Sequence, residues 1–320
     1  MTYVLLLVGF ALLIKGADYF VQGSSKIASL LRVPPLIVGL TIVAFGTGSP
    51  EATVSIIAAL EGNSEVTIGN IVGSNIINTA LIIGVTAFIF PLKVESQTLR
   101  KELPFTLLAS FVLLVMINDI MFQGVAENII TRSDGIILLM FFSIFMYYIF
   151  EVARNSRNLD KSLEVEVKTS TKEWGKNIFI TILGLGAIIL GGYFVVESST
   201  TIAVRFGMSE TLVGLTIVAI GSSLPELITS VTAALKKQSE IALGNIVGSN
   251  IFNILFVLGI SSLITPLPVN NIIFIDIIFM IILTIALLIF SKTQLTVGKY
   301  EGLSLATAYI LYFIYIILRN

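Results

Sequence analysis

The sequence predicts an all-α integral membrane protein with ten transmembrane helices, arranged as two inverted five-helix repeats. Three observations predict this fold. Of the 320 residues, 56 % are hydrophobic and only 12 % are charged, whereas soluble domains carry about a quarter charged residues. The apolar residues fall into ten runs that are long enough to cross a bilayer, which takes about 20 residues. The segment 39–84 also recurs without a gap at 214–259.

The ten apolar runs are separated by turn residues and charges. They lie at residues 2–23, 34–60, 67–90, 103–121, 130–152, 177–204, 209–235, 241–264, 271–290 and 302–319. The first run has neither a basic stretch before it nor a cleavage site, so we expect a permanent span and not a signal peptide. The polar segment 153–176 is expected to be a cytoplasmic linker between the first repeat, residues 1–152, and the second, residues 177–320.

The basic residues indicate which way the chain is inserted. If the N-terminus is outside, the loops on the opposite face hold 15 of the 19 lysines and arginines, and the outer face holds three. Basic loops resist translocation and stay in the cytoplasm. We therefore expect a multi-pass protein of the cell membrane with both termini extracellular. Because each repeat has an odd number of spans, the second repeat is inverted, as in transporters with ion sites near the bilayer midplane.

The missing residue types exclude several functions. The sequence has no cysteine and no histidine, which excludes disulfides, and zinc or haem ligation and proton relays through these side chains. An intramembrane serine hydrolase would lack its common histidine base, so we do not expect an enzyme. The net charge of −1 gives no field that would attract nucleic acid. We expect no cofactor, the lipid bilayer as the surroundings, and a chain that functions as a monomer.

The repeated segment carries a glutamate directly after a predicted break in a membrane helix. Residues 39–51 read GLTIVAFGTGSPE, and residues 214–226 read GLTIVAIGSSLPE. Pro50 and Pro225 have no N–H, so the carbonyls four residues earlier lose their helical partners. Glu51 and Glu226 follow immediately. A charge at bilayer depth costs from about 3 to over 10 kcal/mol, which indicates a paired and functional residue.

A second motif supplies further oxygen atoms. Residues 69–78 read GNIVGSNIIN, and residues 244–253 read GNIVGSNIFN. The GxxxG spacing lets two helix backbones approach closely. Polar residues recur at every fourth position of each copy: Asn70, Ser74 and Asn78, and Asn245, Ser249 and Asn253. The two copies together offer carboxylates, hydroxyls, amide oxygens and freed carbonyls, which are the hard ligands that calcium binds in sets of 6–8.

Both motifs, in both copies, resemble the α-repeats of the sodium/calcium exchanger family, within the cation/calcium antiporter superfamily. The resemblance covers nearly the whole chain and is similar in scale to the compact prokaryotic members. It implies exchange of extracellular sodium for cytosolic calcium by alternating access, with sliding of the first and sixth spans and a central cluster of four ion sites. The metal ligands that it implies are the carboxylates of Glu51 and Glu226, the carbonyls of Ala44, Thr47, Ala219 and Ser222, and the side chains of Ser74, Asn78, Ser223, Ser249 and Asn253.

Three residues depart from the family's usual pattern. Gly48 lacks the hydroxyl expected at one sodium site, and Ser222 replaces the more usual threonine. Asn253 occupies a position that is an aspartate in many prokaryotic and potassium-dependent relatives, so potassium dependence is not expected. These departures bear on the sodium stoichiometry and affinity more than on calcium binding.

The residues leave two other functions open. A proton/calcium antiporter on the same scaffold would use protons that compete for Glu51 and Glu226. A cation channel is also lined by carboxylates and carbonyls. Channels usually form pores on an oligomer axis, whereas this chain carries its own internal repeat, which favours the antiporter.

Overall fold

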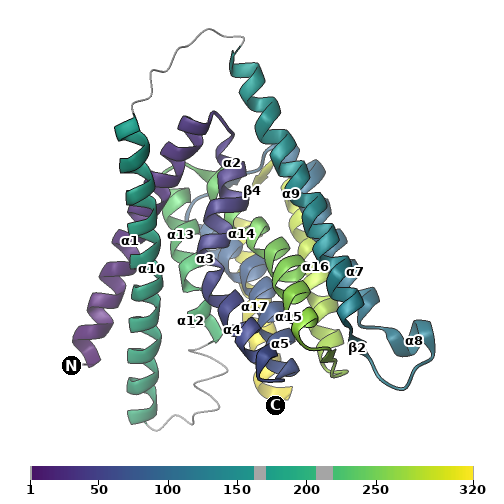
Figure 1. Cartoon of the computed structure of the whole chain (residues 1–320). Coiled ribbons are helices and arrows are strands. Elements are labelled where there is room, and N and C mark those ends of the chain that lie inside the picture. Colours follow the sequence, from purple (N-terminus) through teal and green to yellow (C-terminus); the bar gives the residue numbers. More distant parts are fainter. Residues whose placement is uncertain (1, 162–170, 207–218, 320) are drawn as a thin grey trace.

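Helices account for nearly all of the described structure. The computed structural model describes residues 2–161, 171–206 and 219–319. Long helices stand side by side around shorter, broken ones (Figure 1). The long helices are α1 (Thr2–Leu31), α9 (Arg132–Lys161), α10 (Thr171–Arg205), α16 (Ile273–Lys292) and α17 (Lys299–Arg319).

The shorter elements fall into two groups. The first group is α2 (Pro35–Val38), the π-helical turn η1 (Gly39–Val43), α3 (Ala44–Thr47), α4 (Ser49–Leu60), α5 (Ser64–Ile76), η2 (Ile77–Ile82), α6 (Ile83–Ile89), β1 (Leu92–Lys93), η3 (Thr98–Glu102), α7 (Leu103–Met116), α8 (Asp119–Gln123) and β2 (Ile129–Ile130). The second is α12 (Ala219–Ser222), α13 (Leu224–Leu235), α14 (Ser239–Ile251), η5 (Phe252–Val257), α15 (Leu258–Ile264), β3 (Leu267–Pro268) and β4 (Thr296–Val297).

Seven helices within the described ranges are long and apolar enough to cross a membrane. An eighth candidate is the pair Pro35–Thr47 and Ser49–Leu60, which is bent by 51° at its break. These eight coincide with eight of the ten predicted runs. The predicted run 209–235 lies partly in 207–218, outside the described residues, and its described part contains the 12-residue apolar helix α13.

The remaining predicted run, 103–121, was too long at its C-terminal end. Helix α7 ends at Met116, and the Asn118 Nδ2 donates to the Leu114 carbonyl at 2.7 Å, a side-chain bond that competes with a further helical turn. At the other end, η3 extends this helix by one turn. Helix also extends into both sides of the predicted linker 153–176, because α9 runs to Lys161 and α10 begins at Thr171.

The centre of the bundle is formed by α5–α6 and α14–α15. In these two spans 78 % and 83 % of the most apolar stretch is buried, against 17–39 % in the other long spans. The outer helices therefore present much apolar side-chain surface, as expected of helices that face lipid.

The elements that follow the two motifs repeat with the offset of the sequence. The elements α4, α5, η2, α6 and β1 return 175 residues later as α13, α14, η5, α15 and β3, with matching first and last residues. Both copies thus contain a π-helical turn, and it includes Asn78 in one copy and Asn253 in the other. Such turns are rare and occur frequently at functional sites.

Helices α1 and α10 cross through pairs of glycines. A Cβ atom at Gly9 would lie 3.0 Å from the Gly191 carbonyl oxygen, and one at Gly184 would lie 2.8 Å from the Gly16 carbonyl oxygen. Small residues at these points let the two backbones touch. Since Gly184 and Gly191 follow Gly9 and Gly16 by 175 residues, the contact is reciprocal, as at an interface related by a two-fold axis.

The short strands also pair between the halves of the chain. Strand β1 pairs antiparallel with β4, and β2 pairs antiparallel with β3. The β4 ribbon lies toward the top of the molecule in Figure 1 and β2 at the bottom. Each half therefore completes a ribbon of the other half, at opposite ends of the bundle.

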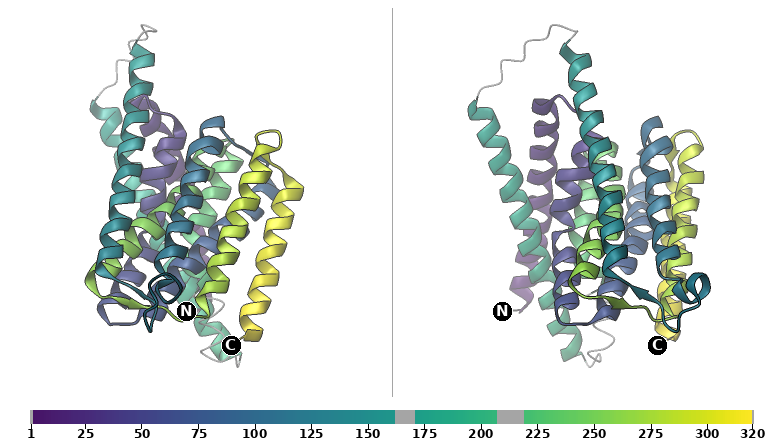
Figure 2. Two further views of the ribbon diagram at one scale, coloured as in Figure 1. Left: turned by 90° about the vertical axis from the view of Figure 1, so that its right-hand side faces the viewer. Right: turned by 45° about the vertical axis from the view of Figure 1, so that its right-hand side comes forward.

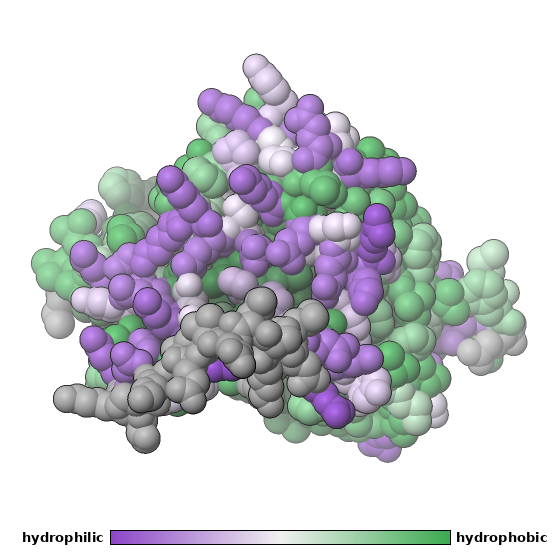
Figure 3. Space-filling view, turned by 90° about the horizontal axis from the view of Figure 1, so that it is seen from above, coloured by the Kyte–Doolittle hydropathy of each residue, from purple (hydrophilic) through white to green (hydrophobic). Residues whose placement is uncertain are grey.

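The two ends of the bundle hold different parts of the chain. Both chain termini lie at the bottom (Figures 1 and 2), whereas α9 ends and α10 begins at the top. Seen from above, the top face carries many hydrophilic side chains, and hydrophobic side chains surround it (Figure 3).

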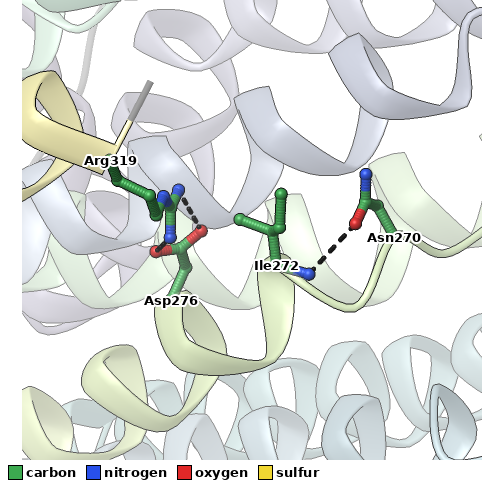
Figure 4. Close-up of polar contacts among 4 residues, drawn as sticks. All are labelled: Asn270, Ile272, Asp276 and Arg319. Atoms are coloured by element: carbon green, nitrogen blue, oxygen red, sulfur yellow. Dashed lines mark hydrogen bonds and ion pairs between the residues drawn. The ribbon is translucent and has the colours of Figure 1, made fainter.

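A buried ion pair ties α17 to α16 at the bottom of the bundle. Both terminal nitrogens of the Arg319 guanidinium contact the Asp276 carboxylate, at 2.9 and 3.0 Å (Figure 4). The Asp276 side chain is only 5 % exposed. Asn270, in the loop before α16, accepts the Ile272 N–H at 3.1 Å. The bidentate geometry fixes the last turn of α17 against the first turn of α16.

Glu102, a buried glutamate outside the two motifs, connects η3, the turn that leads into α7, to α9. The Tyr148 hydroxyl donates to Glu102 Oε1, and the Gln97 amide donates to the Tyr148 hydroxyl at 2.9 Å. Glu102 is fully buried, and its Oε2 has no partner among the described residues.

This contact predicts a difference between two substitutions. Glu102→Gln keeps an acceptor for Tyr148 and removes a buried charge, so the melting temperature in detergent should stay level or rise. Glu102→Ala strands the tyrosine hydroxyl and should cost about 1–3 kcal/mol. A Glu102→Gln protein that melts below Glu102→Ala would contradict this account.

Candidate ion-binding site

The two broken helices meet the two central spans in the middle of the bundle. The chain breaks at Gly48, between α3 and α4, and at Ser223, between α12 and α13. Pro50 and Pro225 are the second residues of α4 and α13, so their missing N–H groups fall where a helix needs no partner. In Figure 1 the chain descends from α2 to α4 and ascends from α12 to α13. The two breaks therefore approach the centre from opposite ends.

One carbonyl that the sequence predicts to be free at the first break has a partner. The Ser49 hydroxyl donates to the Gly46 carbonyl oxygen at 2.8 Å. Position 48 has no hydroxyl, and the hydroxyl of the next residue, Ser49, satisfies this carbonyl within the same turn.

Glu51 and Glu226 occupy the first turns of α4 and α13 and lie together in the interior. Glu51 is 1 % exposed and Glu226 is fully buried. The Ser223 hydroxyl, from the second half, donates to Glu51 Oε1 at 2.6 Å. The Glu51 carboxyl group also lies beside the side chains of Ser74, Asn253 and Glu226. The structure thus brings acidic, hydroxyl and amide groups of both halves to one place.

The position of Gly48 faces this cluster. A Cβ atom at Gly48 would lie 3.7 Å from Glu226 Oε1. A side chain at this position would therefore approach the carboxylate.

Neither glutamate has a basic partner among the residues that the structure describes. The ion pairs within the described ranges are Lys236–Asp18, at 2.7 Å, and Arg319–Asp276. Two buried carboxylates without a counter-charge are costly when ionised. They need a bound cation or a proton.

Five buried oxygen atoms of the cluster have no hydrogen-bond donor among the described residues. They are Glu51 Oε2, both carboxylate oxygens of Glu226, Asn78 Oδ1 and Asn253 Oδ1. Buried acceptors without a donor are rare in folded proteins. These acidic and amide oxygens are a set of ligands for a hard cation.

Most of the remaining predicted ligands have hydrogen-bond partners of their own. The Ala44 carbonyl accepts the Gly48 N–H at 2.9 Å and the Ser249 hydroxyl at 3.3 Å. The Thr47 hydroxyl, fully buried, is 3.0 Å from the Val43 carbonyl and 2.9 Å from Asn245 Oδ1. Ser222 ends α12 and makes a contact of its own.

Ala219 is the first residue described after the gap at 207–218. Its role as a carbonyl ligand stays a prediction.

The amides of Asn70 and Asn245 tie the glutamate-bearing helices to the central spans. Asn70 Nδ2 lies 3.1 Å from the Glu51 carbonyl and 2.9 Å from Ser55 Oγ. Asn245 Nδ2 lies 3.5 Å from the Glu226 carbonyl and 3.0 Å from Ser230 Oγ. The role of these two asparagines is therefore to hold the first turns of α4 and α13 in place.

The glycines of the second motif let one broken helix approach α14. A Cβ atom at Gly244 would lie 2.8 Å from the Leu36 carbonyl oxygen, and one at Gly248 would lie 2.6 Å from that of Leu40. This confirms the predicted close backbone contact in the second copy. The segment expected to face Gly69 and Gly73 of the first copy includes residues outside the described ranges.

Residues 1–151 and 176–318 match the sequence profile of the sodium/calcium exchanger protein family. The chain belongs to the sodium/calcium exchanger family.

Relatives cover the exchanger chain almost from end to end. Sodium/calcium exchanger MaX1 of Methanosarcina acetivorans is 33 % identical over 98 % of this chain and 97 % of its own length. Putative antiporter CaxA of Alkalimonas amylolytica is 41 % identical over 82 % of this chain and 81 % of its own. The crystal structure of the sodium-calcium exchanger NCX_Mj, soaked with zero Na⁺ and Ca²⁺, superimposes with a TM-score of 0.83, at 28 % identity and 98 % coverage of both chains. The compact prokaryotic type is thus confirmed, and with it a cation/calcium antiporter on a membrane-spanning helical fold.

Sequence reasoning missed one part of the site of this exchanger-family chain. Asn250 lies outside the pattern of polar residues at every fourth position, so the pattern predicts no ligand there. Its side chain instead connects Asn78 and Thr79, in the opposite half. The only signal in the sequence is that Thr79 is matched by Ile254 at the offset of 175.

The ties of the two asparagines predict unequal effects of one substitution. Asn245→Ala removes the bonds to Ser230 and Glu226 and also one of the two acceptors of the Thr47 hydroxyl, the one that connects the two halves. Asn70→Ala removes the bonds to Ser55 and Glu51. We expect Asn245→Ala to lower the melting temperature in detergent more, with about 1–3 kcal/mol for each buried group left unpaired. Equal melting temperatures for the two variants would argue against the cross-link between the halves.

Proposed function

We propose that this protein is a secondary-active antiporter that exchanges sodium for calcium across the cell membrane by alternating access. One observation carries the proposal. Five buried oxygen atoms, on Glu51, Glu226, Asn78 and Asn253, have no hydrogen-bond donor among the described residues. Two similar proteins are named sodium/calcium exchangers: MaX1, which is similar in sequence, and NCX_Mj, which is similar in structure. Both names fit this chemistry.

Calcium fits the ligand types of the cluster. Two carboxylates balance the charge of one divalent ion, and calcium takes 6–8 oxygen ligands in flexible geometry. We propose that Glu51 and Glu226 bind calcium together, with Asn78, Asn253, the hydroxyls of Ser74, Ser223 and Ser249, and the carbonyls of Ala44, Thr47, Ala219 and Ser222 completing the calcium and sodium sites. Within the described ranges no group of three or more acidic, histidine or cysteine residues offers an alternative.

We propose sodium exchange because no described basic residue balances the charge of the two carboxylates. Without a basic partner, the two carboxylates need cations in every state that crosses the membrane, because an empty charged site is costly at bilayer depth. Either one calcium ion or several sodium ions supply that charge, and the same ligands cannot hold both sets at once. Mutually exclusive occupancy couples the two fluxes.

The architecture supports alternation between the two sides. We propose ten transmembrane helices in two inverted repeats, residues 1–152 and 177–320, with both termini extracellular and the chain acting as a monomer. The reciprocal α1–α10 contacts and the ribbons exchanged between the halves fit a pseudo-two-fold axis in the membrane plane. The hydrophilic top face holds the ends of α9 and α10, which flank the predicted cytoplasmic linker.

Removing either carboxylate charge should stop exchange. Glu51→Gln and Glu226→Gln each leave one charge for a divalent ion, so sodium-driven calcium-45 uptake into proteoliposomes should fall at least about 100-fold, the factor for losing roughly 3 kcal/mol at a charged ligand. Glu102→Gln is the matched control, because Glu102 is equally buried but lies outside the cluster, and it should transport normally. Unchanged exchange in both cluster variants would end the assignment.

A proton/calcium antiporter is the second candidate, since protons would also neutralise the unpaired carboxylates. We expect calcium-45 uptake to follow the sodium gradient at fixed, equal pH on both sides. Uptake that ignores sodium and follows an imposed pH gradient would select the proton antiporter. Calcium flux that needs neither gradient would select a channel.

A further inference from the structure

We infer that Asn250 and Thr79 are positioning residues that hold the Asn78 amide with its oxygen left free for an ion. The inference rests on the proposed function, because it assigns to these residues the orientation of one ion ligand. Asn250 comes from the second half of the chain, whereas Asn78 and Thr79 lie in the π-helical turn η2 of the first half.

A chain of two hydrogen bonds connects the three side chains. Asn78 Nδ2 donates to Asn250 Oδ1 at 3.1 Å, and Asn250 Nδ2 donates to Thr79 Oγ1 at 2.8 Å. Asn78 is fully buried, Thr79 is 1 % exposed and Asn250 is 4 % exposed. Water therefore does not compete for these bonds.

The chain of bonds decides which end of the Asn78 amide is free. The oxygen and the NH₂ group of an amide are nearly equal in size, so only their hydrogen bonds distinguish the two orientations. The Thr79 hydroxyl oxygen accepts a hydrogen bond from the NH₂ group of Asn250, so the Asn250 oxygen faces Asn78. That oxygen then takes the NH₂ of Asn78. Asn78 Oδ1 is left without a donor, and it can bind a cation, which an NH₂ group would repel.

The second half of the chain lacks this arrangement. Asn75, the counterpart of Asn250, donates to the Ile71 carbonyl of its own helix at 2.7 Å. The counterpart of Thr79 is Ile254, which has no hydroxyl. Neither polar atom of the Asn253 side chain has a partner among the described residues. The Asn78 amide is thus oriented before an ion arrives, whereas no comparable chain of hydrogen bonds among the described residues orients the Asn253 amide.

An oriented ligand binds more tightly because its ordering cost does not fall on the binding step. Thr79→Val has nearly the same shape but removes the end of the chain, so Asn250 and then Asn78 become free to turn. We expect the KM for calcium to rise roughly fivefold, which is within the range that one hydrogen bond supplies. The kcat should stay within about twofold, since a ligand that is only reoriented still binds once turned.

The test measures initial calcium-45 uptake into sodium-loaded proteoliposomes. Thr79→Ser keeps the hydroxyl and should restore the wild-type KM. Thr86→Val is the matched control, because Thr86 lies two turns further along the same span, is fully buried and has no partner for its hydroxyl among the described residues. Thr79→Cys, with a weaker acceptor, should raise the KM as Thr79→Val does, and it replaces Thr79→Val if that protein fails to fold.

A double-mutant comparison isolates the path through Asn78. If Thr79 acts through Asn78, Thr79→Val should add nothing to the KM of Asn78→Ala. An unchanged KM for Thr79→Val, or the same further rise in the Asn78→Ala background, would overturn the inference while wild-type exchange stands. A wild-type protein without sodium-dependent uptake would overturn the proposed function itself, and the inference with it.

Discussion

Two carboxylates buried at the centre of an apolar bundle, without a basic partner, are the constraint on which the rest of the structure depends. Glu51 and Glu226 lie beside each other at under 2 % exposure. In water two such charges repel each other by only about 1 kcal/mol at 4 Å, but the interaction grows severalfold in the protein interior. The surrounding groups respond to this charge: the Ser223 hydroxyl donates to Glu51 at 2.6 Å, and the backbone breaks two residues before each of the prolines that precede the two glutamates.

The two halves build this site by exchanging contacts. Ser223 donates to Glu51, Asn245 accepts the Thr47 hydroxyl, and Ser249 donates to the Ala44 carbonyl, each across the boundary between the halves. The exchanged strands and the glycine contacts of α1 and α10 follow the same rule at the periphery. A movement of one half against the other would therefore change the ligands around the carboxylates, which is what an exchanger with alternating access requires.

Much of the fold and the composition of the site could be predicted from the sequence. The repeat at an offset of 175 located both helix breaks, both glutamates and both polar stripes. What could not be predicted are pairings between residues far apart in the chain. The Asn250–Thr79 bond depends on how closely η2 and α14 approach, and Ser49 satisfies Gly46 through the local shape of one turn. Periodicity also cannot show that Asn118 ends α7 before its apolar run ends.

The central claim is that one ion set at Glu51 and Glu226 alternates between calcium and sodium. The most direct measurement is anomalous diffraction from crystals soaked in strontium, with and without a large excess of sodium. The account predicts one strong peak within roughly 2.3–2.6 Å of carboxylate oxygens of both glutamates, the range of calcium–oxygen distances, and its loss when sodium is added. A peak elsewhere, or one that persists unchanged in sodium, would contradict the account.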